Sequence, residues 1–271
     1  ISAPANERLM QLLVMVDAAK RASAERITAV LPYFGYSRQD RKDKPRVPIS
    51  AKLVLNLLQS AGVNRVITMD LHSPQVGGFT DLPFDHLTFE PVLVDYLKSK
   101  HHCLDRRDNI VIMAPDVGAV KRAEKYSNYL SCDFGFISKK RLGDEKVEFQ
   151  SLVGEVKDKH VIIIDDLTES AGTLIQAAEE CKKQGSKKVT CAVTHACLTE
   201  TGIHRLNAVM PHPNIKDTQS IVDEFIHSNN VDFWWNTKYK PQDIVCLDTS
   251  EIFSKAIHRI HNNESVSELF L

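Results

Sequence analysis

Residues 161–173 read Val-Ile-Ile-Ile-Asp-Asp-Leu-Thr-Glu-Ser-Ala-Gly-Thr, and this stretch decides the fold. Its first four residues are all β-branched, which favours a strand. Two aspartates follow, and a loop of small residues then leads into a segment with helical periodicity. The stretch therefore predicts a strand, a turn and a helix, which is the repeating unit of an α/β protein.

Strand and helix patterns alternate along the whole chain, as in parallel sheets flanked by helices. Apolar runs predict strands at 27–31, 66–69, 110–113, 134–137, 161–164 and 189–193. Helical periodicity is present near 5–24, 50–62, 90–100, 117–130, 171–184, 215–228 and 250–262. Pro83 and Pro91 bracket a loop-like stretch. We therefore predict two domains, at 1–88 and 89–271, with the last helix able to pack back on the first domain.

The first domain has only two clear strands, at 27–31 and 66–69. Two parallel strands leave both sheet edges and much apolar helix surface exposed. The chain also begins Ile1-Ser2-Ala3-Pro4, without an initiator Met. We expect this domain to lack its amino-terminal strands, and an upstream segment or another subunit to supply them.

The charge balance limits the classes of partner. The 271 residues include 34 Lys and Arg against 35 Asp and Glu, a net charge of -1. Because nucleic acids and anionic membranes attract basic proteins, neither is expected as a partner. No apolar run approaches the ~18 residues of a membrane span. The six cysteines form no Cys-x-x-Cys pair, so we expect reduced, mostly buried thiols and a cytoplasmic location.

Acidic residues follow three of the predicted strands. They occur in Asp70-Leu71-His72, in Pro115-Asp116 and in Asp165-Asp166. Ligands of parallel α/β sheets bind outside the carboxyl ends of the strands, so these side chains should converge. Carboxylates and an imidazole predict a divalent-cation site, and Mg²⁺ prefers oxygen ligands. The alternative is that each acid only caps the helix after its strand.

The loop after Asp166 has the composition of a sugar-phosphate site. Amide groups at the start of its helix, with the hydroxyls of Ser170 and Thr173, can hold a phosphate monoester. Asp165 and Asp166 can accept hydrogen bonds from ribose hydroxyls. The loop therefore predicts a ribose 5-phosphate site. Neither of the common glycine-rich nucleotide fingerprints occurs in the chain.

Two segments concentrate basic residues. Residues 37–46 contain five basic and two acidic residues, which favours a polyphosphate contact over a solvated surface. Lys139-Lys140-Arg141 leads into the charged stretch 143–146. This second cluster is either an exposed turn or a mobile loop that closes over a transferring phosphoryl group.

Motifs in order along the chain connect these observations: residues 36–43, 48–52, 68–72, 115–116 with 121–122, 154–158, 165–173 and 261–267. From about Leu9 to Phe270 the chain resembles ribose-phosphate diphosphokinases, also called phosphoribosyl pyrophosphate synthetases. The resemblance implies two domains of phosphoribosyltransferase type with catalysis between them, ATP and ribose 5-phosphate as substrates, and Mg²⁺. It also implies hexamers built from dimers, or hetero-oligomers with related subunits, with phosphate and ADP as effectors.

The resemblance also implies roles for individual residues. These are Arg38, Gln39 and Asp43 for ATP; His72 and Asp116 for Mg²⁺, with Asp70, Asp81 and Asp85 as weaker ligands; Asp165, Asp166, Glu169, Ser170, Gly172 and Thr173 for ribose 5-phosphate; Lys139 and Arg141 for catalysis; and Lys42, Arg46, Ser265 and Ser267 for the effectors.

Some features depart from the family. Glu169 stands where the family usually has Asp, and residues 205–233 match the family poorly, with a helix expected at 216–229. Trp234 and Trp235 are expected in a core or an interface. The upstream segment that contributes to a neighbouring adenine site in the family is not in this chain.

Three functions follow. The first is diphosphoryl transfer from MgATP to the anomeric hydroxyl of ribose 5-phosphate. The second is a non-catalytic subunit that regulates a related enzyme. The departures from the family at Glu169 and at residues 205–233 favour it. The third is a phosphoribosyltransferase. The basic segment at 36–46, which resembles an ATP site, argues against it.

Overall fold

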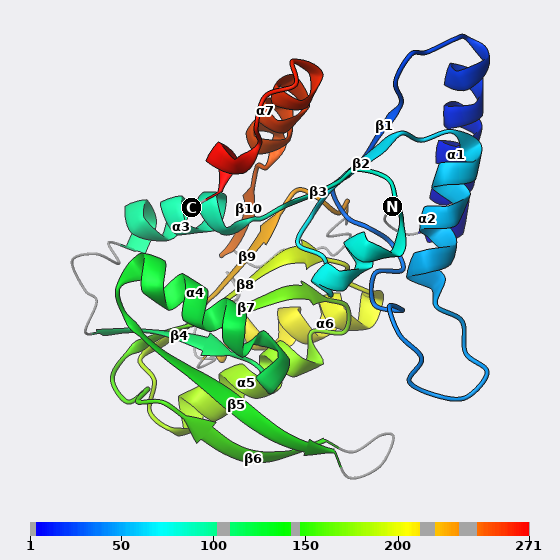
Figure 1. The fold of residues 1–271 in the computed structure, drawn as a ribbon. Helices are drawn as coiled ribbons and strands as arrows, with labels where there is room; N and C mark the ends of the chain where they lie inside the picture. Colours follow the sequence, from blue (N-terminus) through cyan, green and yellow to red (C-terminus); the bar gives the residue numbers. More distant parts are fainter. Residues whose placement is uncertain (1–3, 102–108, 142–146, 212–219, 233–242, 271) are drawn as a thin grey trace. The chain divides into compact units, whose positions relative to one another are not determined.

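The computed structural model describes residues 4–101, 109–141, 147–211, 220–232 and 243–270. The chain forms two compact units. The N-terminal unit contains the described residues up to Phe89, together with Asn230–Asp232 and Ser265–Phe270. The C-terminal unit contains the described residues of 90–229 and 243–264. Both have parallel strands flanked by helices, which confirms the predicted α/β class (Figure 1).

The N-terminal unit has a three-stranded parallel sheet in the order β1-β2-β3, formed by Thr28–Leu31, Arg65–Met69 and Phe84–Leu87. Helices α1 (Ala5–Arg21) and α2 (Ser50–Ala61) share one core with β1. The four buried residues of α2, Ala51, Val54, Leu55 and Leu58, follow the i, i+3, i+4, i+7 spacing of a single helix face. The short 3-10 helix η1 spans Pro74–Phe79.

Strand β3 corrects the prediction of a loop between Pro83 and Pro91. The four-residue strand is too short and too polar to give a strand pattern, because it contains Asp85 and His86. Each has a partner that the sequence does not reveal: Arg65 for Asp85, and the amide of Leu71 for His86.

The C-terminal unit has a seven-stranded sheet in the order β10-β9-β8-β7-β4-β5-β6. Its strands are β4 (Ile110–Ala114), β5 (Asp133–Arg141), β6 (Val147–Val153), β7 (His160–Thr168), β8 (Lys188–Ala196), β9 (Glu224–Ser228) and β10 (Ile244–Leu247). Every neighbouring pair is parallel except β5 and β6. The central strands β4 and β7 lie side by side, so their carboxyl ends share one edge.

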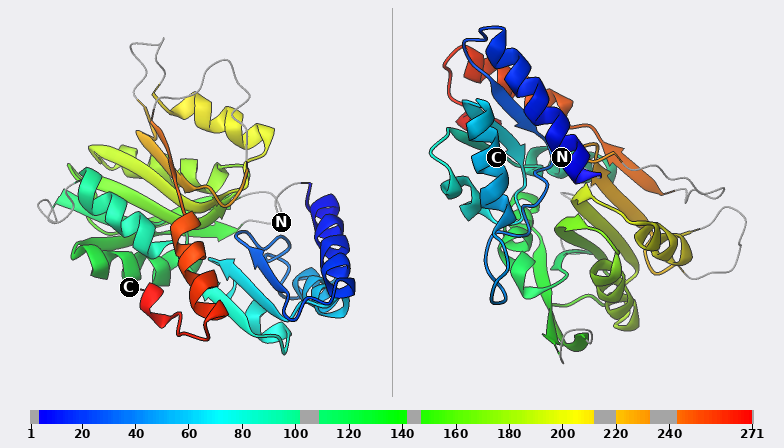
Figure 2. Two further views of the ribbon diagram at one scale, coloured as in Figure 1. Left: turned by 90° about the horizontal axis from the view of Figure 1, so that it is seen from above. Right: turned by 90° about the vertical axis from the view of Figure 1, so that its right-hand side faces the viewer.

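Helices cover both faces of this sheet (Figures 1 and 2). Helices α5 (Gly172–Lys183) and α6 (Glu200–Val209) pack with one face of the strands, including Val161 and Ile163. Helices α3 (Glu90–His101) and α4 (Val120–Leu130) lie on the other face. Helix α7 (Ser250–His261) follows β10. Because β4 and residues 161–164 of β7 are buried on both faces, these stretches contain only apolar residues.

One predicted helix is wrong. Residues 212–219 lie outside the described chain, but 224–228 form β9, a strand buried along its whole length, instead of the end of a helix. Asp223 and Glu224 are charged residues within the predicted helix. In the structure Lys182 pairs with Asp223 and Lys188 with Glu224, so both acids are accommodated beside the sheet. Helix α6 and strands β6 and β10 were also not predicted.

The cysteines are less buried than predicted. The five within the described chain form no disulfide with one another; Cys181 and Cys191 are buried, Cys132 and Cys197 are partly buried, and Cys246 is exposed. Cys103, Trp234 and Trp235 lie outside the described residues. In the described part of the chain, no helix combines the length and the hydropathy that crossing a membrane requires.

Candidate functional site

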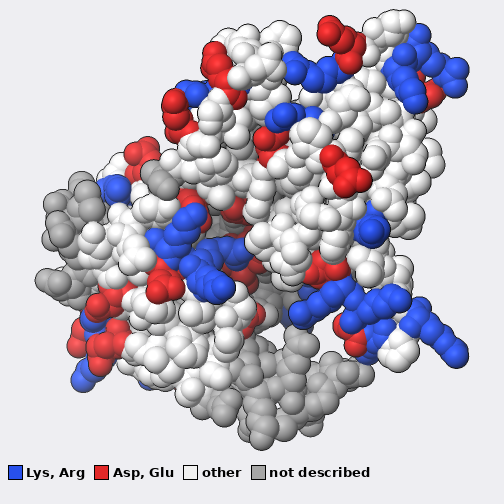
Figure 3. All heavy atoms as spheres, viewed as in Figure 1, with Lys and Arg blue, Asp and Glu red and all other residues white. Residues whose placement is uncertain are grey.

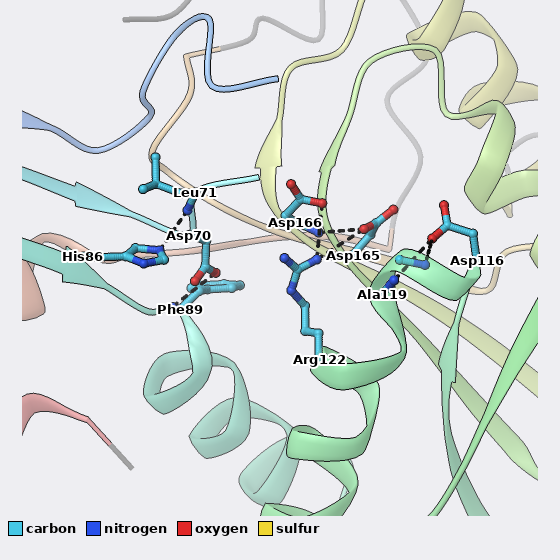
Figure 4. Close-up of polar contacts among 10 residues, drawn as sticks. Asp70, Leu71, His86, Phe89, Asp116, Ala119, Arg122, Asp165 and Asp166 are labelled. Carbon is cyan, nitrogen blue, oxygen red and sulfur yellow. Dashed lines mark hydrogen bonds and ion pairs between the residues drawn. The ribbon is translucent and has the colours of Figure 1, made fainter. Parts of the chain in front are cut away.

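The two acids near the carboxyl end of β7 contact one arginine (Figure 4). Arg122 of α4 donates from Nη1 to Oδ1 of Asp165 at 3.3 Å and to Oδ1 of Asp166 at 3.2 Å. The Asp165 and Asp166 side chains are only 17% and 7% exposed. The fold therefore places two adjacent carboxylates and one cation where a ligand of a parallel sheet binds.

Asp165 is electrostatically strained. Burial raises the pKa of Asp165 above its ordinary value, because a carboxylate loses hydration there. The neighbouring carboxylate of Asp166 raises it further, whereas the guanidinium of Arg122 acts in the opposite direction. Such a pair favours a ligand that brings hydrogen-bond donors, such as sugar hydroxyls.

The N-cap alternative is correct for one oxygen of Asp116. Oδ1 of Asp116 accepts from the amides of Gly118 at 2.9 Å and Ala119 at 3.3 Å, and so caps the short helix η3 (Val117–Ala119). Both bonds reach Oδ1, so Oδ2 can still bind a cation. Asp165 and Asp166 cap no helix, because the N-cap of α5 is Ala171.

The loop between β7 and α5 presents a helix start to solvent. Ala171 has a left-handed backbone with φ 57°, and α5 begins at the next residue. The amide of Gly172 faces the Ser170 hydroxyl at 3.4 Å, and Ser170 and Thr173 are both exposed. First-turn amides carry the positive end of the helix dipole. The loop can therefore bind an anion such as a phosphate.

Helix α6 supports this loop, a role that the sequence did not indicate. Thr199 donates to the carbonyl oxygen of Glu169 from its amide at 3.0 Å and from its hydroxyl at 3.2 Å. A Cβ atom at Gly202 would lie 2.2 Å from the same oxygen, so the helix can approach the loop only with glycine there. The signal available in the sequence was Thr199 before Glu200, an N-cap pattern after a strand.

The predicted metal ligands of the N-terminal unit lie at two ends of strand β2 and do not form one group. Asp70 and His72 follow the carboxyl end of β2, and Asp70 has the unusual φ of 38°. Oδ2 of Asp70 accepts from the Phe89 amide at 3.3 Å (Figure 4). His72 and Asp81 are exposed. Asp85 instead accepts from Nη1 of Arg65 at 2.8 Å, at the amino end of β2, away from Asp70 and His72.

His86 is a residue that the sequence-based site did not include. Its Nε2 accepts from the amide of Leu71 at 2.9 Å, so it supports the turn that carries Asp70 and His72 (Figure 4). In the described part of the chain, no three His, Cys, Asp or Glu side chains gather as a metal cluster.

The predicted ATP segment is exposed and basic. Figure 3 shows Lys and Arg side chains gathered where residues 37–46 lie. Arg38, Gln39 and Asp43 are exposed, and so are the effector candidates Lys42 and Arg46. The segment is anchored at its start by Ser37, which is buried. Ser265 and Ser267, also exposed, belong to the same compact unit, where the Ser267 amide donates to the Ser265 hydroxyl at 3.2 Å.

The catalytic candidates Lys139 and Arg141 lie at the end of a strand, not in a loop. The strand predicted to end at Ile137 continues as β5 to Arg141, and pairs in antiparallel fashion with β6. Lys139 is opposite Phe149 and Arg141 is opposite Val147. The two side chains and residues 142–146 lie outside the described part of the chain.

Comparisons with known proteins agree along nearly the whole chain. The N-terminal domain of ribose phosphate pyrophosphokinase matches residues 1–62, and the phosphoribosyl transferase domain matches residues 89–229. The ribose-phosphate pyrophosphokinase of Chlorobaculum tepidum is 44% identical over 267 residues, covering 98% of this chain and 77% of the relative. That of Fusobacterium nucleatum is 43% identical over 269 residues, covering 99% and 80%.

A solved structure leads to the same family. The crystal structure of phosphoribosylpyrophosphate synthetase from Mycobacterium smegmatis aligns with a TM-score of 0.84 and 33% identity. The alignment covers 97% of this chain and 80% of that one. Fold, motifs and relatives therefore agree with the family resemblance of the sequence. The chain belongs to the ribose-phosphate pyrophosphokinase family.

Proposed function

We propose that this protein transfers the diphosphoryl group of MgATP to the 1-hydroxyl of ribose 5-phosphate, giving phosphoribosyl pyrophosphate and AMP. The observation that carries the proposal is the end of β7, where two largely buried carboxylates are followed, after a short loop, by an accessible helix start. Ribose hydroxyls and a phosphate monoester are complementary to this pair of features.

Each part of the loop has a role in holding ribose 5-phosphate. Asp165 and Asp166 accept hydrogen bonds from the ribose hydroxyls, and Arg122 limits the repulsion between them. Ser170, Gly172 and Thr173 bind the phosphate through hydroxyls and helix-start amides. Glu169 is tied to Thr199 through its main-chain carbonyl, so its side chain, longer than the usual Asp, can extend over the sugar without moving the loop.

The donor set suits Mg²⁺. This ion prefers oxygen ligands and is commonly held by one or two protein groups with water and substrate phosphates. Asp116 offers Oδ2 for such a contact, and no larger protein cluster is needed. His72 and Asp116 would hold the ion, with Asp70 and Asp81 as weaker ligands; Asp85 is the least suited of the predicted ligands, because it is paired with Arg65. When bound, the ion would neutralise charge on the phosphate oxygens of ATP.

Positioning and charge stabilisation supply most of the acceleration in such a reaction. Arg38, Gln39 and Asp43 bind ATP on the exposed basic segment. The 1-hydroxyl oxygen attacks the β-phosphorus, the bond from that phosphorus to the α–β bridging oxygen breaks, and the hydroxyl proton is released. Lys139 and Arg141 stabilise the charge that builds on the leaving and terminal oxygens.

The reaction is tested by incubating the purified protein with MgATP and ribose 5-phosphate and measuring AMP. The Lys139→Ala variant should lower kcat by about 10²–10³, the usual cost of removing one transition-state donor, with little change in ribose 5-phosphate affinity. An unchanged kcat would refute the role of Lys139. If the protein is silent alone but alters the activity of a related enzyme, the non-catalytic subunit is correct.

The same proposal includes assembly, regulation and location. We infer a homo-oligomer, as hexamers built from dimers, or a hetero-oligomer with related subunits, in the cytoplasm. Phosphate as activator and ADP as inhibitor would bind at Lys42, Arg46, Ser265 and Ser267, which belong to one compact unit. A rate insensitive to phosphate and ADP would remove the regulatory part.

A further inference from the structure

The loop that is to bind the phosphate has the wrong charge by itself. Residues 165–173 include Asp165, Asp166 and Glu169 and no basic residue. A phosphate monoester carries close to two negative charges at neutral pH. Like charges at short distance oppose binding, and helix-start amides carry only a partial positive charge. A cation from another element would offset this charge and strengthen phosphate binding, and Arg122 already contacts the two aspartates.

Arg205 of α6 supplies a cation at this position. Its Nη1 donates to the carbonyl oxygen of Ser170 at 3.3 Å. The same nitrogen lies 3.3 Å from the place of a Cβ atom on Gly172, the first residue of α5. The guanidinium therefore lies beside the helix start, and Arg205 is exposed there. A guanidinium has five N–H donors, so the contact with Ser170 leaves others for a ligand.

The orientation of α6 makes this placement reproducible. Thr199 caps α6 by accepting from the Gly202 amide at 3.2 Å, and it also binds the Glu169 carbonyl. Gly202 lets the helix backbone approach that carbonyl. Arg205 follows Gly202 by three residues, nearly one helical turn, and so projects from the same face toward the loop.

We propose that Arg205 binds the 5-phosphate of the sugar substrate and holds the Ser170–Gly172 loop in its binding shape. The inference rests on the proposed function, since it assigns a further residue to the same ribose 5-phosphate site. The two arginines then have separate roles: Arg122 offsets the negative charge of Asp165 and Asp166, and Arg205 offsets the negative charge of the phosphate.

Two variants separate phosphate binding from support of the loop. Arg205→Lys keeps the charge, whereas Arg205→Gln keeps a hydrogen-bond donor for the Ser170 carbonyl but loses the charge. We expect Arg205→Gln to raise KM and Kd for ribose 5-phosphate about 10- to 100-fold, as for a lost charge-assisted hydrogen bond. Arg205→Lys should recover most of this loss. The KM for ATP should stay unchanged and kcat should change only a few-fold.

Lys183→Gln is the matched control. Lys183 lies at the last turn of α5, has a side chain that is 70% exposed, and carries the same charge as Arg205. Its replacement removes one positive charge from the same unit at the opposite end of the helix, so ribose 5-phosphate binding should be unchanged. Equal losses in Arg205→Gln and Lys183→Gln would mean that only net charge matters, and would overturn the inference.

Calorimetric titration with ribose 5-phosphate distinguishes failure of the inference from failure of the proposed function. If the wild-type protein and both Arg205 variants bind the sugar phosphate equally, Arg205 has no role in binding, whatever the turnover. If the wild type binds it but forms no AMP, the proposed reaction fails while Arg205 is still tested by Kd. If the wild type binds no ribose 5-phosphate, both proposals fail together.

Discussion

Asp165→Asn should stabilise the protein while impairing ribose 5-phosphate binding. The asparagine oxygen can still accept from the Asp166 amide, which lies 2.9 Å from Oδ1 of Asp165, and from Arg122 at 3.3 Å. What it removes is a charge that the fold holds in a poorly hydrated place beside a second carboxylate. Buried acids of this kind are retained in proteins because ligand binding requires them.

The sign of the pH dependence follows from the raised pKa of Asp165. Below the unfolded-state value of 3.8 the carboxyl is protonated in both states and costs nothing. As pH rises, the unfolded chain loses this proton first, so the folded state becomes less favourable until the folded-state pKa is passed. Each unit of pKa displacement corresponds to about 1.4 kcal/mol. We expect Asp165→Asn to gain about 1–3 kcal/mol at pH 8 and less at pH 5.

Urea unfolding at pH 5, 6, 7 and 8 measures this effect, with Asp133→Asn as the control. Asp133 is in the same unit but is 66% exposed and pairs with Lys159, so its replacement should cost no more than about 1 kcal/mol. A midpoint for Asp165→Asn below that of the parent at pH 8 would refute the reasoning. So would a difference that stays constant from pH 5 to pH 8, because a displaced pKa must make it grow.

Two further substitutions test the supports of the two units. Gly202→Ala should lower stability by about 1–3 kcal/mol and raise the KM for ribose 5-phosphate, because the new Cβ would lie 2.2 Å from the main-chain oxygen of Glu169. Gly78→Ala is the control, because its Cβ would have nothing within 4 Å. Equal urea midpoints for the two variants would contradict the prediction. Asp85→Asn should lower the free energy of unfolding by about 1–2 kcal/mol, because it breaks the partly buried ion pair with Arg65. The Mg²⁺ concentration needed for half-maximal rate should stay the same. A shift in that concentration would instead indicate that Asp85 is a metal ligand.

The strands that were predictable from the sequence are those with one continuous apolar run. β4 and residues 161–164 of β7 have helices on both faces, so burial selects apolar residues throughout these stretches. β9 is equally buried but begins with Glu224, whose oxygens accept from Lys188, Thr190 and Tyr96. These partners come from other elements, so the sequence around Glu224 does not reveal them. Local pattern cannot distinguish a paired buried charge from a solvated one.

The candidate site likewise has a part that the sequence predicts and a part that it does not. The acids and hydroxyls of the loop are contiguous, so their spacing alone predicted a sugar-phosphate site. The two arginines that balance them are distant in sequence: Arg122 is 43 residues from Asp165, and Arg205 is 35 residues from Ser170. Nothing near either arginine indicates its partner. Only the adjacency of β4 and β7 and the approach of α6 to the loop bring these charges together.

This arrangement explains how one loop can hold a sugar and a dianion at adjacent positions. If the compensating cations were in the loop itself, they would pair with Asp165 and Asp166 and remove the acceptors that ribose hydroxyls need. Held on α4, Arg122 contacts the two carboxylates at 3.2 and 3.3 Å, longer than the ~2.7–2.9 Å of an optimal charged pair. The charge of the acids is thus balanced by long contacts, and their oxygens can still accept from incoming hydroxyl donors. Burial and the neighbouring Asp166 carboxylate raise the pKa of Asp165 against the effect of Arg122, and this makes stability fall as pH rises.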